Sequence, residues 1–204
     1  RGANVTPGFW RQDELWRASV DEEGYYRSGD AARFIDDAAP EKGLVFDGRI
    51  AEDFKLATGT WVSVGPLRAR VIAAGAPYVQ DVVVTGLDRD EVGALILPHL
   101  ESCRRLCPGL PADATQARVV RDDAVRAYYA SLIERLASES TGSASRVARA
   151  MLLEDPPSID IGEVTDKGSI NQRALLKARS ALVEELYAEP RSARVIMPHR
   201  ARAN

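Results

Sequence analysis

Two short apolar segments separated by a polar loop set the strongest limit on how this chain folds. Residues 78–85 read YVQDVVVT, and residues 91–97 read EVGALIL. β-Branched side chains favour extended backbone, so both segments are expected to be strands. The loop between them, residues 86–90, is short and polar and contains Gly86, which is typical of a hairpin connection. The pattern therefore predicts a β-hairpin in the middle of the chain.

Helical spacing of apolar residues predicts the elements that pack on this hairpin. Residues 122–138 are expected to form an amphipathic helix, because apolar side chains recur there at helical spacing: Val125, Tyr128, Tyr129, Leu132, Ile133 and Leu136. Pro66 suits the first turn of another helix, which follows a brief strand at 61–64. A third strand at 147–153 and a helix at 171–187 complete the pattern. Strands and helices mix without strict alternation, which indicates an α+β fold.

The segments at the two ends of the chain differ from this central part. The start is rich in turns, with a short helix expected at 12–20 and two strands at 32–35 and 43–46. Residues 47–49 are expected to form a turn, and the change of composition that follows indicates a domain boundary. The tail from Pro190 is expected to be mobile and is basic, with Arg191, Arg194, Arg200 and Arg202.

Charge and cysteine content exclude several classes of protein. Lys plus Arg number 27 and Asp plus Glu number 30, and this net charge of −3 argues against a general nucleic-acid binder. The longest stretch without these four residue types, 56–67, is too short to span a membrane. Cys103 and Cys107 are the only cysteines, so no disulfide framework is expected and a cytoplasmic location is favoured. Because residue 1 is Arg, we expect a processed, trimmed or partial chain.

One cluster of residues contains possible metal ligands. His99, Cys103 and Cys107 recur every four residues and would share one face of a helix. Structural zinc normally has four ligands, and no fourth is evident here. We therefore expect partly buried thiols and no metal.

Three polar turns, in this order along the chain, are candidates for binding chemistry. In the first, Asp30 follows Gly29, and its two carboxylate oxygens match the adjacent hydroxyls of a ribose; a β-turn in which Asp30 bonds its own backbone is the alternative. In the second, Arg49 and Lys55 offer cations for phosphate or ribose oxygens. In the third, Lys167 lies in a polar loop ahead of a helix, where it is either a solvated lysine or a mobile charge for an anionic substrate.

These turns together resemble a known family. The segments RGANVTPGFW, GYYRSGDAARF and GLVFDGR and the Lys167 loop are similar to the adenylate-forming acyl-CoA synthetases. The run DGRIAEDFKLATGTWVSVGPLRARVI is especially similar to the feruloyl-CoA synthetase branch, which acts on hydroxycinnamic acids. The resemblance extends over nearly the whole chain. It implies two steps: a carboxylic acid and ATP give an acyl-adenylate and pyrophosphate, and coenzyme A then displaces AMP to form a thioester.

The resemblance also implies a domain organisation and a set of partners. Residues 1–48 would be the end of the large N-terminal, AMP-binding domain, and residues 49–204 the small, mobile α+β C-terminal domain. The cofactors would be ATP with Mg²⁺ and coenzyme A, and the substrate a small carboxylic acid. The expected partner of this chain is the missing N-terminal domain, with neither nucleic acid nor membrane.

Roles for individual residues follow from the resemblance alone. Asp30 would bind the ribose hydroxyls, with Arg49 beside it, and Lys167 would be the catalytic lysine that contacts the carboxylate and phosphate. The remaining residues would form the coenzyme A side of the domain and the hinge: Lys55, Gly59 and Trp61, and Ile50, Ala51 and Glu52.

The sequence also departs from the family pattern. Ala51 stands where the family usually has a hinge Asp or Lys, and Gly168 follows the lysine where the family has glycine before it. The register of the catalytic lysine is therefore open, with Lys177 as the second candidate. We expect the chain to be a C-terminal fragment that is inactive alone. The alternative is a non-enzymatic module that docks on a carrier protein or another partner. An exposed apolar patch around Phe9, Trp10, Trp16 and Phe46 would favour the fragment.

Overall fold

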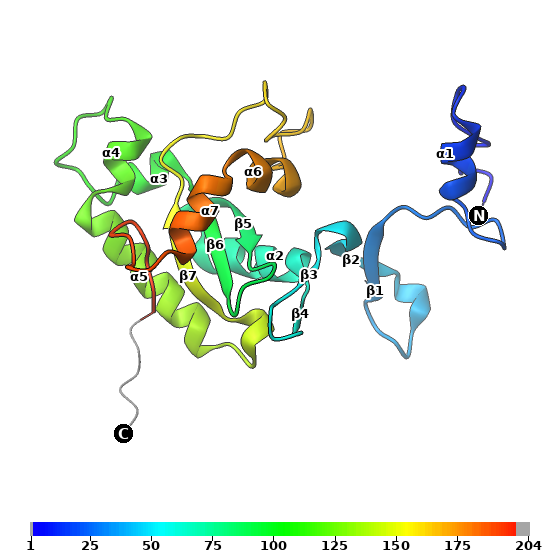
Figure 1. Ribbon diagram of the computed structural model, residues 1–204, viewed down its shortest axis with the longest axis horizontal. Coiled ribbons are helices and arrows are strands. Elements are labelled where there is room, and N and C mark those ends of the chain that lie inside the picture. The colour runs from blue at the N-terminus through cyan, green and yellow to red at the C-terminus, as the bar shows by residue number, and fades with distance from the viewer. Residues whose placement is uncertain (1, 199–204) are drawn as a thin grey trace. The chain divides into compact units, whose positions relative to one another are not determined.

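Residues 2–198 are described by the computed structural model, in which the chain divides into the units Arg1–Ala51 and Glu52–Asn204 (Figure 1). The first unit contains helix α1 (Asp13–Ala18) and the antiparallel strands β1 (Asp30–Phe34) and β2 (Leu44–Arg49). A 3-10 turn, η1 (Pro40–Lys42), lies in the connection between the two strands. The two strands predicted from the sequence are therefore confirmed.

The turn predicted at 47–49 is wrong, because these residues continue β2. Arg49 pairs with Asp30 and Gly48 pairs with Ala31, next to a bulge between Ala31 and Ala32. Gly48 has φ +105°, a conformation that side chains other than glycine rarely adopt. A bulge and a left-handed glycine let the pairing continue through a sequence that otherwise looks like a turn.

One face of the β1–β2 hairpin is apolar and open. Phe34 pairs with Leu44, and Phe46 pairs with Ala32, so these four side chains share a face. The expected patch is only partly exposed: Trp10 is 84% and Phe46 64% accessible, whereas Phe9 and Trp16 contact each other edge to face with ring centres 5.4 Å apart. Within residues 2–51, no apolar side chain belongs to either hydrophobic core.

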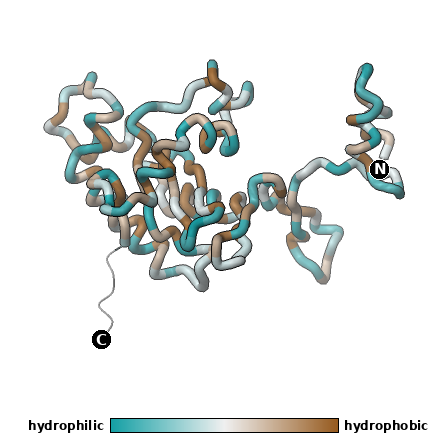
Figure 2. The backbone as a smooth tube through the Cα atoms, in the orientation of Figure 1, coloured by the Kyte–Doolittle hydropathy of each residue, from teal (hydrophilic) through white to brown (hydrophobic). Residues whose placement is uncertain are grey.

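The second unit is built on a three-stranded sheet in the order β5-β6-β7. Strands β5 (Val79–Thr85) and β6 (Val92–Pro98) are antiparallel, and β6 is parallel to β7 (Val147–Leu152). The predicted hairpin and third strand are confirmed, and so is the α+β class, because helices cover both faces of this mixed sheet. Figure 2 shows hydrophobic segments gathered in the strands.

Alternation along the strands separates two cores. Val82, Val84 and Ile96 face α2 (Val64–Gly75) and α5 (Asp123–Ser138). Val83 and Leu95 face the opposite side, with α6 (Gln172–Ala178) and α7 (Ser180–Tyr187). Successive strand residues point to opposite faces, so near-continuous apolar runs are needed to fill both cores.

Short elements complete the second unit. Helix α3 (Leu100–Arg104) follows β6, and α4 (Gln116–Val120) precedes α5. The hairpin of β3 (Phe54–Lys55) and β4 (Trp61–Val62) lies before α2. The 3-10 turns η2 (Ile50–Glu52) and η3 (Ser143–Ser145) precede β3 and β7. No helix in residues 2–198 combines the length and the apolar character that crossing a bilayer requires.

Two further expectations are wrong. The helix predicted over 171–187 is interrupted at Arg179, where φ −110° and ψ 32° end α6 and begin α7. The start of the tail is held in place: Ile196 is buried and exchanges two 2.8 Å backbone hydrogen bonds with Ala150, and Arg194 pairs with Glu185 at 2.7 Å. Two of the four tail arginines, Arg200 and Arg202, lie outside the described residues.

Candidate functional site

Asp30 and Arg49 lie together at the end of the β1–β2 hairpin. Their backbones are paired, and Arg49 Nη1 lies 2.7 Å from Asp30 Oδ1. The same nitrogen donates a hydrogen bond to the Ser28 carbonyl at 3.2 Å. The Asp30 backbone N–H donates to Ser28 Oγ at 3.2 Å. Antiparallel pairing thus brings together two residues nineteen positions apart.

One oxygen of the Asp30 carboxylate is enclosed. Oδ1 is buried, its contact with Arg49 is an ion pair without hydrogen-bond geometry, and no other hydrogen bond reaches it from the described residues. The Asp30 side chain is 33% and that of Arg49 57% accessible. The alternative in which the Asp30 side chain bonds its own backbone is not what the structure shows, since the Ser28 hydroxyl accepts that N–H. An approaching hydroxyl group can therefore donate to the accessible part of this carboxylate, and it would reach Oδ1 only after a shift of Arg49.

The three residues expected to form the hinge adopt a tight turn. Ile50–Glu52 is the 3-10 turn η2, and the division into two units falls between Ala51 and Glu52. The Ile50 N–H donates to the Gly29 carbonyl at 3.0 Å. Beyond the turn, Asp53 Oδ1 accepts the Val64 N–H at 2.9 Å and so satisfies a free donor at the start of α2.

The residues expected on the coenzyme A side share the β3–β4 hairpin. Lys55 pairs with Trp61 across the two strands, and its ammonium lies 6.0 Å from the Trp61 ring centre. Gly59 has φ +83°, in a turn closed by its N–H donating to the Leu56 carbonyl at 2.9 Å. Trp61 is about half exposed. The hairpin therefore presents an aromatic ring, a cation and a glycine turn to its surroundings.

Lys167 lies at the exposed tip of a small hairpin turn between β7 and α6. Val164 and Ile170 form a β-bridge at the base of the turn. Above the bridge, the Thr165 N–H donates to the Ser169 carbonyl at 2.8 Å, and the two hydroxyls lie 2.8 Å apart. The second candidate, Lys177, is exposed on α6. The turn thus presents the Lys167 ammonium on an ordered stem.

A buried ion pair under this turn was not predicted. Glu163 is 1% accessible and receives two hydrogen bonds from Arg179, at 2.7 and 2.8 Å. The Arg179 guanidinium holds the pKa of Glu163 below its usual range, against the opposing effect of burial. The two residues are sixteen positions apart. The only sequence signal was a carboxylate at the start of the lysine loop, which does not identify its partner.

The Lys167 turn and the β3–β4 hairpin lie at different edges of the second unit. In Figure 1 the loop between β7 and α6 lies along the upper edge, whereas β3 and β4 lie towards the lower edge. Within the first unit the structure brings Asp30 to Arg49. Within the second it brings Lys55 to Trp61 but does not bring Lys167 to that pair.

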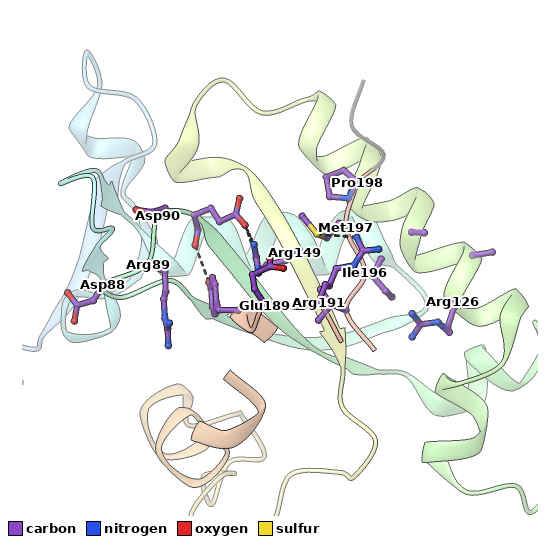
Figure 3. Close-up of a pocket in the computed structure, with 15 residues that line it drawn as sticks. Asp88, Arg89, Asp90, Arg126, Arg149, Glu189, Arg191, Ile196, Met197 and Pro198 are labelled. Atoms are coloured by element: carbon purple, nitrogen blue, oxygen red, sulfur yellow. Dashed lines mark hydrogen bonds and ion pairs between the residues drawn. The ribbon is translucent and has the colours of Figure 1, made fainter. Parts of the chain in front are cut away.

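One groove of the second unit contains none of the predicted site residues. It has a volume of about 1240 Å³ and lies among the β5–β6 loop, α5, α7 and the segment around Met197 (Figure 3). Arg149 Nε donates to Glu91 at 2.6 Å, and Arg89 contacts Glu184 at 2.5 Å. Three of the charged side chains that line this groove, Arg89, Glu91 and Arg149, are thus held in ion pairs.

His99, Cys103 and Cys107 do not converge on a common point. His99 Nδ1 accepts the Ser102 N–H at 3.3 Å and caps α3, whereas Cys103 Sγ lies 3.5 Å from the Tyr129 hydroxyl. Burial raises the pKa of both thiols, which makes them poor nucleophiles. Among residues 2–198 no group of three or more His, Cys, Asp or Glu side chains is arranged to hold a metal ion.

Comparison with known proteins identifies relatives of this chain. A long-chain-fatty-acid–[acyl-carrier-protein] ligase of Arabidopsis thaliana is 22% identical over 92% of this chain and 25% of its own length. A CoA ligase of Gibberella moniliformis is 26% identical over 91% of this chain and 28% of its own length. The chain thus spans about a quarter of these relatives.

The fold has solved counterparts. The A domain of the carboxylic acid reductase of Segniliparus rugosus, solved with AMP and a carboxylic acid, matches with a TM-score of 0.70 at 21% identity, over 93% of this chain and 27% of that one. The sequence model of the AMP-binding enzyme C-terminal domain matches residues 53–191. Because that match covers most of the chain, this protein belongs to the AMP-binding enzyme C-terminal domain family of the adenylate-forming superfamily.

Proposed function

We propose that this chain is the C-terminal part of an AMP-forming acid–CoA ligase that activates ferulate or a related hydroxycinnamate. The observation that carries the proposal is the Asp30–Arg49 pair, in which a cation lies beside a carboxylate whose side chain is 33% accessible. A ribose hydroxyl can donate to the accessible part of such a carboxylate. Asp30 would hold the ribose of ATP, and Arg49 would orient Asp30.

Lys167 is the proposed catalytic lysine. Adenylation builds negative charge on the α-phosphate and on the leaving pyrophosphate, so a positioned cation lowers the barrier. Lys167 is exposed at the tip of an ordered turn, which suits a group that must reach a substrate bound elsewhere. Lys177 fits less well, because it projects from the helix α6.

The β3–β4 hairpin is the proposed coenzyme A side. Lys55 would attract the phosphates of coenzyme A, Trp61 would pack on its pantetheine arm, and Gly59 would allow close approach of the backbone. Because Lys167 and this hairpin lie at different edges of one unit, one orientation of the domain would not serve both steps (Figure 1). Rotation about Ile50, Ala51 and Glu52 would present them in turn.

The remainder of the enzyme would be an N-terminal domain that joins residues 1–48. The relatives are about four times longer than this chain, and the open apolar face of Phe34, Leu44 and Phe46 has the character of a surface covered by protein. Residues 49–204 would then be the mobile domain. ATP with Mg²⁺, the carboxylic acid and coenzyme A would meet in the complete enzyme.

The hydroxycinnamate substrate rests on the resemblance of residues 47–72 to the feruloyl-CoA synthetase branch. The relatives found by comparison include ligases named for fatty acids, so acid and acceptor must be tested together. The full-length protein should be incubated with ATP, Mg²⁺ and either ferulate or a long-chain fatty acid. Pyrophosphate release and thioester formation should be measured with coenzyme A and with an acyl-carrier protein.

We expect ferulate with coenzyme A to give pyrophosphate, AMP and a thioester. Turnover only with fatty acids, or only with a carrier protein, would reject the proposed substrate or acceptor and leave the adenylate-forming class intact. If neither acid leads to pyrophosphate release, the enzyme assignment is rejected and a non-enzymatic module is favoured.

A further inference from the structure

The buried Glu163–Arg179 ion pair lies beneath the lysine turn and makes more hydrogen bonds than packing alone requires. We propose that Glu163 and Arg179 are positioning residues for adenylation, which hold the Lys167 turn in the orientation that the first step needs. The inference rests on the proposed function of Lys167. Neither residue is a catalytic group, because both act through the turn that they support.

Glu163 makes hydrogen bonds that fix the base of the lysine turn. Its carboxylate accepts the Ser158 N–H at 2.8 Å in addition to its two bonds from Arg179. Its own N–H donates to the Ser158 carbonyl at 2.9 Å, and its carbonyl accepts the Asn171 N–H at 2.9 Å. The backbone and side chain of Glu163 therefore tie together the entry and the exit of the lysine loop.

Arg179 links this base to the helices behind it. Its Nη1 donates to the Asp155 carbonyl at 2.8 Å, and its Nη2 donates to the Pro156 carbonyl at 3.0 Å. Arg179 is also the residue at which α6 ends and α7 begins. A planar guanidinium donates in fixed directions, so one side chain sets the positions of the loop start, of Glu163 and of the helix junction.

The constraint extends from Glu163 to Lys167 through the stem of the turn. Val164 pairs with Ile170 directly after Glu163, and Thr165 pairs with Ser169 by backbone and hydroxyl contacts. Only residues 166–168 project beyond this stem. A shift of Glu163 would therefore move the Lys167 ammonium with it, without breaking the turn itself.

Stability alone does not explain a buried ion pair of this kind. Removing two charges from water offsets much of their attraction, so apolar residues of similar size often stabilise a fold equally well. A bidentate pair adds fixed geometry, and that is what a catalytic lysine on a loop needs. By comparison, the Glu185–Arg194 pair in the same unit is about 30% accessible on each side and joins α7 to the segment that follows it.

The test uses the full-length enzyme and separates its two half-reactions. Glu163→Gln removes the negative charge and keeps the shape of the side chain. Arg179→Lys keeps the positive charge but loses the planar guanidinium that donates two hydrogen bonds to Glu163. Glu185→Gln is the matched control. Adenylation is measured by pyrophosphate exchange, and thioester formation is measured from supplied acyl-adenylate and coenzyme A. We expect Glu163→Gln and Arg179→Lys to slow adenylation about 10- to 100-fold, as small misplacements of a reacting group do.

A positioning role also requires that thioester formation stays within about twofold of the wild-type rate for these variants, because the second step would use a different face. Hydrogen exchange adds a readout independent of chemistry: amides 158–170 should exchange faster in Glu163→Gln, while those of α5 should not change. The control Glu185→Gln should leave all of these measurements unchanged.

The outcomes separate this inference from the proposed function. An equal loss in both half-reactions, or unchanged adenylation in a folded Glu163→Gln enzyme, would overturn the positioning role alone. A wild-type enzyme without adenylation would overturn the proposed function and this inference with it. Faster exchange in the loop together with a selective loss of adenylation would support both.

Discussion

At the scale of residues, the proposed ribose contact depends on the Asp30 carboxylate. Its side chain is 33% accessible and lies 2.7 Å from Arg49 Nη1. Elsewhere on the same hairpin, Arg33 and Asp47 approach only to 3.9 Å. The two pairs differ in place and in geometry, so they provide a test and its control.

Replacing Asp30 should weaken nucleotide binding by the full-length enzyme. Asp30→Ala removes hydrogen bonds from the ribose to a charged acceptor, and such bonds contribute about 1.5–3 kcal/mol each. The dissociation constant of ATP, measured by isothermal titration calorimetry, should rise at least about tenfold. Asp47→Ala should leave the constant unchanged, and equal constants for the two variants would contradict the role of Asp30.

The Glu163–Arg179 pair predicts a dependence of stability on pH. The Arg179 guanidinium lowers the pKa of Glu163 in the folded chain, so the charged form is favoured by folding. Its stabilising contribution is present above the unfolded pKa of about 4.3 and is lost as the pH falls through the lower native pKa. Urea unfolding of wild type and Glu163→Gln should therefore differ most near neutral pH and converge in acid. A difference that grows as the pH falls would have the wrong sign.

At the scale of elements, the sequence was informative wherever the structure depends on neighbouring residues. The β5–β6 hairpin follows from two apolar runs and a polar loop, and α5 follows from helical spacing with Asp122 as its N-cap, which accepts the Ala124 N–H at 2.9 Å. The polar turn of Lys167 could likewise be identified because it is local, whereas Arg49 lies in β2 and not in the expected turn.

Elements that depend on distant partners could not be predicted. The break at Arg179 follows from its bonds to Glu163 and to residues 155–156, and the ordered tail follows from pairing of Ile196 with Ala150. The periodicity of apolar residues gave no reason to end a helix at Arg179 or to expect that the start of the basic tail pairs with β7. The extension of β2 to Arg49 was not predicted, because Gly48 in the sequence suggests a turn. The bulge in the partner strand, between Ala31 and Ala32, is seen only in the structure.

Close packing of α7 on the sheet predicts the effect of one added methyl group. A Cβ on Gly93 in β6 would lie 2.7 Å from the Tyr187 hydroxyl and 2.8 Å from Leu186 Cδ2. Gly93→Ala should therefore reduce the free energy of unfolding by about 1–3 kcal/mol, the usual effect of overpacking. Gly109→Ala is the control, since a Cβ there meets nothing within 4 Å. Similar urea midpoints for both variants would contradict the packing described for α7.

At the scale of the whole molecule, the two units differ in self-sufficiency. Residues 52–198 fill two cores on opposite faces of one sheet, whereas residues 2–51 leave the apolar face of the β1–β2 hairpin open. We interpret this contrast as a complete small domain preceded by the end of a larger one.

This interpretation predicts that Phe46 matters only in the full-length protein. Phe46 is 64% exposed in this chain, so Phe46→Ala should change the stability of the isolated chain by no more than about 0.5 kcal/mol. In the full-length enzyme, where the face would be buried, the loss should be about 3–5 kcal/mol. Thermal unfolding of both lengths checks this, with Leu87→Ala in the second unit as control. A small effect in both lengths would argue against a covering domain.

The central claim is that one small domain serves two chemical steps through two separate edges. The most direct measurement compares Lys167→Ala and Trp61→Ala of the full-length enzyme in the two half-reactions. Lys167→Ala should slow adenylation about 100- to 1,000-fold and leave thioester formation from supplied acyl-adenylate intact. Trp61→Ala should show the reverse selectivity. Adenylation at the wild-type rate in Lys167→Ala, or loss of the same half-reaction in both variants, would contradict the account.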